Sequence, residues 1–236
     1  MNFEELKLRA KEIEQGNYQI ISRDEVATLI DHTNLKPTST PRDIENLIEE
    51  AIRHRFKTIC INPCYVRLAA QKLEGSRIEV CTVIGFPLGQ NTTEIKIRET
   101  ERALEDGASE FDMVLNVGKL KAGDYEYVKN EIAAIKKIVG DKILKVIIET
   151  AYLEDTEKVK ATELIIEAGA DFVKTSTGFG PGGATVYDVL ILSAVAQGKI
   201  GVKAAGGIRS YEDALKMITA GATRIGASRS VQIVTE

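Results

Sequence analysis

Two lysines, each at the end of a short apolar segment and close to a glycine-rich loop, are the residues of this sequence best suited to chemistry. Lys174 lies in DFVKTSTGFGPGG (residues 171–183), and Lys203 lies in GVKAAGGIRS (residues 201–210). A neutral lysine amine adds to a carbonyl group and forms a Schiff base. A second ammonium nearby and partial removal from water both favour the neutral amine. The pair therefore indicates an amine nucleophile for a carbonyl substrate.

Other charged and polar residues recur on the same face of the segments that read as strands. Strand side chains alternate between two faces, so Lys174 and Phe172 share one face, and Asp112 shares its face with Val114 and Asn116. The inward-facing set predicted in this way also contains Lys145, Glu149, Lys203 and Cys60, while Asp31 ends the first strand. Buried unpaired charges are costly, so we expect either a functional cluster or a satisfied network of ion pairs. In the functional case Asp112 supplies the acid–base group.

Glycine-rich turns follow three consecutive late strands. They are GFGPGG (178–183), AGG (205–207) and GAS (226–228). Backbone N–H groups at such turns bind phosphate, and barrel enzymes commonly place a phosphate site after their late strands. We therefore predict that phosphate lies against these three turns, with the Ser228 hydroxyl as a further donor. Arg209 and Arg229 either add positive charge or are ordinary surface arginines.

About eight strand–helix alternations position these residues. The expected strands are 26–33, 57–63, 77–87, 109–118, 142–150, 171–177, 199–207 and 223–228, with amphipathic helices between them. They are short, rich in Val and Ile, and nearly continuous in apolar character, which is typical of strands buried on both faces. The pattern predicts the α/β class and a (β/α)₈ TIM barrel with an extra N-terminal helix. A doubly wound open sheet is the competing fold, but HTNLKPTST (32–40) contains no dinucleotide-binding fingerprint.

No linker or low-complexity segment divides the chain. We expect one TIM-barrel domain over residues 1–236, in which residues 1–22 form an N-terminal capping helix region. Phe3, Leu6, Ala10 and Ile13 recur at helical spacing and predict an amphipathic helix from Asn2 to Gln15.

The composition excludes several classes of function. Apolar residues make up 44% of the chain, charged residues make up 28%, and the net charge is −4, so nucleic acid is not an expected partner. No apolar run is long enough for a membrane helix and no signal peptide is recognisable, so we expect a cytoplasmic protein. The three cysteines and two histidines have no zinc-site spacing, so we expect no metal.

The motifs closely resemble those of the deoxyribose-phosphate aldolases. The matching segments, from Asp31 to Ser230, are DHTNLKPTST, ICINPCYV, CTVIGFPLG, EFDMVLNVG, LKVIIET, DFVKTSTGF, GVKAAGGIR and IGAS. The resemblance implies a class I aldolase without cofactor. Such an enzyme reversibly cleaves 2-deoxy-D-ribose 5-phosphate to acetaldehyde and D-glyceraldehyde 3-phosphate, in the catabolism of deoxyribose phosphate and deoxyribonucleotides.

The resemblance also implies residue roles. Lys174 matches the Schiff-base lysine, Lys203 the lysine that perturbs it, and Asp112 the acid–base aspartate. Gly178, Gly206, Gly207, Gly226 and Ser228 match the family's phosphate site. Thr177 and Lys145 match other active-site positions, and we group Asp31 and Cys60 with the substrate-facing residues. Some relatives have a lysine where this chain has Phe179. Family members are often dimers or tetramers, so we expect a homo-oligomer.

Two other functions stay open at this point. One is a lysine-dependent aldolase or transaldolase that acts on another sugar phosphate. The other is a catalytically silent barrel that only binds phosphorylated metabolites.

Overall fold

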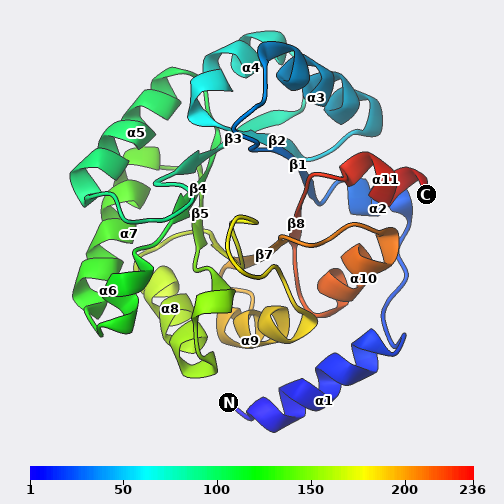
Figure 1. The fold of residues 1–236 in the computed structure, drawn as a ribbon, viewed down its shortest axis with the longest axis vertical. Helices are drawn as coiled ribbons and strands as arrows, with labels where there is room; N and C mark the ends of the chain where they lie inside the picture. Colours follow the sequence, from blue (N-terminus) through cyan, green and yellow to red (C-terminus); the bar gives the residue numbers. More distant parts are fainter.

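Eight parallel strands form a closed barrel surrounded by helices (Figure 1). The computed structural model describes all residues, 1–236. The strands are β1 (Ile30–Asn34), β2 (Thr58–Ile61), β3 (Glu79–Ile84), β4 (Glu110–Val114), β5 (Ile143–Ile147), β6 (Phe172–Lys174), β7 (Gly201–Ala205) and β8 (Arg224–Ala227). Because β8 pairs with β1, with Gly226 opposite Asp31, the sheet has no free edge. The predicted (β/α)₈ barrel is therefore confirmed, and the open sheet is wrong.

The helices cover the outside of the barrel in chain order. They are α1 (Phe3–Glu14), α2 (Arg23–Ala27), α3 (Pro41–His54), α4 (Val66–Lys72), α5 (Thr93–Glu105), α6 (Val117–Lys121), α7 (Tyr125–Val139), α8 (Asp155–Glu167), α9 (Val186–Ala196), α10 (Tyr211–Thr219) and α11 (Ser230–Thr235), with two short 3₁₀ helices, η1 (Pro63–Tyr65) and η2 (Thr150–Tyr152). Their starts are encoded locally, since Thr40 and Ser210 each accept a hydrogen bond from an N–H of the first turn. None of these helices is both long and apolar enough to cross a bilayer.

The N-terminal part differs from the expectation in two ways. Residues 26 and 27, expected in a strand, belong to α2, which begins with a capping box between Ser22 and Glu25. Helix α1 packs beside α9 and α10, outside the ring of helices, rather than across an open end of the barrel (Figure 1). Ala10 and Ile13 are its buried residues.

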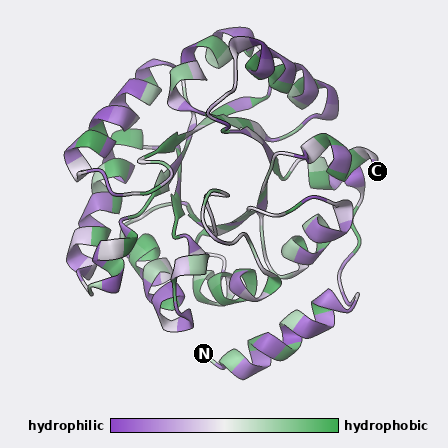
Figure 2. Ribbon diagram, in the orientation of Figure 1, coloured by the Kyte–Doolittle hydropathy of each residue, from purple (hydrophilic) through white to green (hydrophobic).

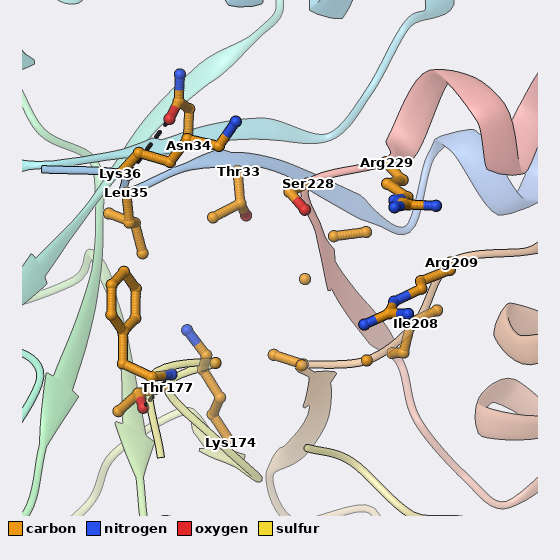
Figure 3. A pocket seen from close by; sticks show the side chains of 17 residues that line it. Thr33, Asn34, Leu35, Lys36, Lys174, Thr177, Ile208, Arg209, Ser228 and Arg229 are labelled. Atoms are coloured by element: carbon orange, nitrogen blue, oxygen red, sulfur yellow. Dashed lines mark hydrogen bonds between the residues drawn. The ribbon is translucent and has the colours of Figure 1, made fainter. Parts of the chain in front are cut away.

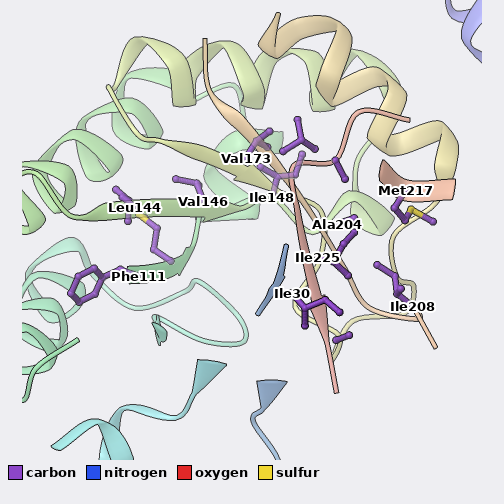
Figure 4. Close-up of a cluster of buried hydrophobic side chains, with 14 of the residues drawn as sticks. Ile30, Phe111, Leu144, Val146, Ile148, Val173, Ala204, Ile208, Met217 and Ile225 are labelled. Atoms are coloured by element: carbon purple, nitrogen blue, oxygen red, sulfur yellow. The ribbon is translucent and has the colours of Figure 1, made fainter. Parts of the chain in front are cut away.

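The main apolar core lies between the barrel wall and the helices. Val146, Val173 and Ile225, which alternate with charged residues along their strands, are completely buried there (Figure 4). The helices turn hydrophobic residues toward the barrel and hydrophilic residues outward (Figure 2). Because the apolar residues of each strand occupy this outer layer, the alternate residues must point into the barrel.

A buried ion pair between α5 and α7 lies at the carboxyl ends of β3 and β4. The Lys96 Nζ on α5 donates to Glu131 Oε2 on α7 at 2.8 Å and to the Val114 carbonyl oxygen at 2.9 Å. Both side chains are fully buried. A Cβ on Gly85, just after β3, would lie 2.8 Å from Lys96 Cε, so Gly85 leaves the room that this side chain needs.

We predict that Glu131→Ala lowers the free energy of unfolding by about 3–5 kcal/mol, because it leaves the Lys96 ammonium buried without its partner. Urea denaturation measures the loss. The paired replacement Lys96→Met with Glu131→Leu is the control, and it should cost much less because no charge remains buried. Equal losses in the two proteins would contradict this explanation.

Candidate active site

Three lysines converge on one carboxylate inside the barrel. Lys174 Nζ on β6 lies 2.7 Å from Asp112 Oδ2 on β4, and Lys203 Nζ on β7 lies 2.6 Å from the same oxygen. Lys145 Nζ on β5 donates to Asp112 Oδ1 at 2.9 Å. All four side chains are at most 3% exposed. The structure therefore brings together residues that are up to 91 positions apart in the sequence.

Asp31 on β1 joins this cluster from the side of the barrel opposite β4 and β5. The Lys203 ammonium donates to Asp31 Oδ2 as well as to Asp112, and Lys145 Nζ lies 3.8 Å from Asp31 Oδ2. Burial acts to raise the pKa of Asp112, but Lys145, Lys174 and Lys203 outweigh it and hold that pKa well below the usual range. Burial likewise acts to lower the pKa of Lys203, and Asp112 and Asp31 outweigh it and raise that pKa. Both partners are therefore kept charged.

Sequence reasoning missed two members of the cluster, Glu110 and Arg224. Arg224 Nη1 donates to Asp31 Oδ1 at 2.7 Å and to Glu110 Oε2 at 2.8 Å. Glu110 Oε2 also lies 2.5 Å from Lys145 Nζ. A signal for Glu110 was present, since it lies two residues before Asp112, a predicted inward position. Arg224 had no such signal, because the sequence placed Gly226, two residues later, only in a turn.

Two buried thiols line the same interior. Cys60 on β2 and Cys81 on β3 are register partners, and Cys81 Sγ lies 3.3 Å from Asp112 Oδ1 and 3.4 Å from Lys145 Nζ. Burial raises the pKa of the Cys81 thiol. The thiols and Asp112 are close enough to share a cation, but ammonium groups already occupy both oxygens of Asp112. A metal would therefore have to displace a lysine.

A cavity of about 310 Å³ opens above this cluster (Figure 3). Of the seven charged residues that meet inside the barrel, Lys174 alone lines it. The Lys174 amine points into the space between Thr33, Thr177 and Arg209. The cavity is lined by Thr33, Asn34, Leu35, Lys36, Lys174, Thr177, Gly178, Phe179, Ala205, Gly206, Gly207, Ile208, Arg209, Gly226, Ala227, Ser228 and Arg229.

The predicted phosphate-site residues all lie on this cavity wall. Gly206 and Gly207 have φ of 87° and 83°, a backbone region that other residues rarely adopt. A Cβ on Gly226 would lie 3.1 Å from Lys203 Cε, so this glycine makes room for the buried lysine. By contrast, the predicted substrate-facing residues Asp31, Lys145 and Cys60 lie beneath the cavity and do not line it.

Phe179 and Glu149 have positions that the alternation along the strands did not predict. Phe179 lines the cavity and stacks edge-on against Phe86, with ring centroids 5.4 Å apart. Glu149 does not belong to the inward face of β5, because the strand ends at Ile147 and Glu149 has a left-handed φ of 52°. Its Oε2 instead accepts hydrogen bonds from the N–H and the hydroxyl of Thr177. Asn116 likewise leaves the inward face and caps α6.

We predict that Asp112→Asn lowers the free energy of unfolding by about 3–5 kcal/mol at pH 7, since three ammonium groups lose their common carboxylate. The folded-state pKa of Asp112 is depressed, so its contribution is present above about pH 4 and is lost as the pH falls through the folded value. The raised pKa of Lys203 keeps that lysine's contribution intact up to about pH 10. Urea unfolding at pH 3, 5, 7 and 9 should give a constant difference from pH 5 to 9 and a smaller one at pH 3. A difference that grows between pH 5 and 3 would contradict the prediction.

Comparison with known proteins gives the family. The sequence model of the DeoC/LacD family aldolases matches residues 25–230. The chain is 57% identical over 214 residues to the deoxyribose-phosphate aldolase of Caldanaerobacter subterraneus subsp. tengcongensis, covering 89% of this chain and 93% of that protein. It is 56% identical to the same-named enzyme of Thermococcus kodakarensis, covering 91% and 97%. The solved deoxyribose phosphate aldolase of Aeropyrum pernix superposes with a TM-score of 0.87 at 36% identity, covering 94% of each chain. The chain therefore belongs to the DeoC/LacD family of aldolases.

Proposed function

We propose that this protein is a class I aldolase that reversibly cleaves 2-deoxy-D-ribose 5-phosphate to acetaldehyde and D-glyceraldehyde 3-phosphate. The observation that supports it most strongly is the placement of Lys174. Its amine is the one amine of the buried cluster that reaches the cavity, and it contacts the Asp112 carboxylate. The names of the curated relatives support the choice of substrate.

The cavity has two chemically different ends, and these fit the two ends of the substrate. Lys174 supplies the amine at the end nearest the cluster. The other wall has the glycine turns, the Ser228 hydroxyl and the guanidinium groups of Arg209 and Arg229. Phosphate binds to backbone N–H groups and guanidinium groups of this kind. A phosphorylated sugar therefore lies with its aldehyde carbon at Lys174 and its phosphate at these turns.

In the first step the neutral Lys174 amine attacks the aldehyde carbon, and loss of water gives an iminium ion. Asp112 does not line the cavity, so it removes the proton from the hydroxyl two carbons along through a water molecule. The bond between the second and third carbons breaks, and its electron pair moves toward the iminium, leaving an enamine. Glyceraldehyde 3-phosphate departs. Protonation of the enamine and hydrolysis of the imine release acetaldehyde and restore Lys174.

Lys203 has a different role from Lys174, because its ammonium group keeps its proton. It contacts both Asp31 and Asp112 and its pKa is raised. It therefore stays protonated beside Lys174, where its positive charge disfavours a second charge on Lys174 and orients Asp112. Lys203 thus promotes formation of the neutral nucleophile without reaching the cavity.

We also infer that the chain assembles from identical subunits, as a dimer or a tetramer, because the Aeropyrum pernix relative is tetrameric. Light scattering of the purified protein tests the assembly.

We predict that borohydride reduction in the presence of acetaldehyde adds one ethyl group to the protein, at Lys174. Lys174→Leu should abolish the adduct, and Lys203→Leu should slow its formation at neutral pH at least tenfold. Peptide mass spectrometry locates the modification. An equal yield of adduct in Lys174→Leu would exclude the proposal, and faster cleavage of fructose or sedoheptulose phosphates than of deoxyribose phosphate would change the substrate.

A second prediction concerns the phosphate end of the cavity. Arg209→Met should raise KM for deoxyribose 5-phosphate about tenfold, the equivalent of about 1.4 kcal/mol of lost charge-assisted binding. The KM for unphosphorylated deoxyribose should not change, because that sugar has no group for Arg209 to bind. Steady-state assays on the two substrates measure both values. An equal rise on both sugars would show that Arg209 does not contact the phosphate.

A further inference from the structure

A second layer of charge lies beneath Lys174, on the side away from the cavity. It consists of Glu110 at the start of β4 and Arg224 at the start of β8. The guanidinium binds Glu110 through both of its terminal nitrogens, at 2.8 and 3.3 Å. It also lies over the Phe172 ring, 5.4 Å from the ring centre. Neither residue lines the cavity, so neither can contact a substrate bound there.

This layer is continuous with the cluster that contains Lys174. Arg224 donates to Asp31, which binds Lys203, and Glu110 binds Lys145, which binds Asp112. Both routes end at the Asp112 carboxylate that Lys174 contacts. Glu110 is therefore three contacts away from Lys174, and Arg224 is four contacts away.

Counting the charges of the cluster gives one cation in excess. Every strand contributes a titratable side chain to it: three carboxylic acids (Asp31, Glu110, Asp112), three lysines and one arginine (Lys145, Lys174, Lys203, Arg224), and two thiols (Cys60, Cys81). With all acids and bases ionised and the thiols protonated, three negative charges face four positive charges.

Lys174 is the cation of the cluster with the fewest carboxylate contacts, so we assign the excess positive charge to it. Lys203 contacts two carboxylates and Lys145 contacts three. Lys174 contacts only Asp112, and it shares that oxygen with Lys203. It is also the member next to the cavity, where a released proton can leave. Release of one proton from Lys174 leaves three charges of each sign in the barrel.

We propose that Glu110 and Arg224 are positioning residues that set the charge balance of the buried cluster, so that Lys174 is the residue that releases a proton. This inference rests on the proposed role of Lys174 as nucleophile. The pair acts through Asp31 and Lys145 and not by contact with substrate. Its two members act in opposite directions: Glu110 favours the protonated form of Lys174, and Arg224 disfavours it.

The test is the pH dependence of borohydride trapping with acetaldehyde, measured on the intact 236-residue chain as the rate of adduct formation at Lys174. Glu110→Gln removes a negative charge, so the midpoint of the pH profile should move down by about one pH unit. Arg224→Gln removes a positive charge, so the midpoint should move up by a similar amount. The double variant, Glu110→Gln with Arg224→Gln, restores the balance and should return the midpoint close to that of the wild type.

These opposite shifts distinguish charge setting from a merely structural role, which would lower the rate without moving the midpoint. Two single shifts in the same direction, or an unchanged midpoint in both single variants, would overturn the inference. Wild-type protein without any adduct at Lys174 would instead reject the proposed function. Glu163→Gln, which removes one charge of the exposed pair with Lys160, is the matched control and should leave the profile unchanged.

If a single variant fails to fold, as judged by circular dichroism, charge-conserving variants decide the question. Arg224→Lys and Glu110→Asp keep the charge count but alter the contacts. They should lower the trapping rate and keep the midpoint of the wild type. A midpoint moved by half a pH unit or more in either variant would overturn the inference.

Discussion

The structure depends on one constraint: charges buried inside a closed barrel must find partners there. A buried ion without a partner is several kcal/mol less stable than the same ion in water. Asp112 satisfies the constraint for three lysines at once, because its two oxygens accept from Lys145, Lys174 and Lys203. Removing that carboxylate would leave three ammonium groups facing one another. The same contacts that stabilise the barrel therefore prepare the nucleophile, since they hold the neighbours of Lys174 in their charged forms.

The barrel separates stability and chemistry into two layers. Residues such as Val173 and Ile225 form the apolar layer under the helices, and the charged layer lies inside, with most of its members beneath the cavity. Only the Lys174 end of the charged layer meets the cavity. A substrate in the cavity therefore reaches one amine of the charged layer, that of Lys174, while the groups that control the charge of Lys174 lie below the cavity.

The sequence by itself determined the alternation of strands and helices and the inner face on which the lysines of the cluster and Asp112 lie. Period-two alternation with apolar outer residues is a local property, so the inward direction of Lys174, Lys203, Asp112 and Lys145 could be predicted. The helix caps at Ser210 and Asp124 are local in the same sense, because each side chain bonds to an N–H group only three residues away. The glycine turns could be placed close to one another, because they follow consecutive strands of the predicted barrel.

Tertiary structure alone decided which inward groups touch and which reach the cavity. Glu110 and Arg224 meet only because β4 and β8 face each other across a closed barrel. The two residues are 114 positions apart, and no local pattern in the sequence indicates that they are in contact. Strand ends were also decided by packing: Glu149 leaves the strand pattern after Ile147 because it bonds to Thr177 in the next loop. Depth in the barrel depends on how the strands are staggered against one another. Asp31, Lys145 and Cys60, correctly placed on the inner face, thus lie below the cavity and not on its wall.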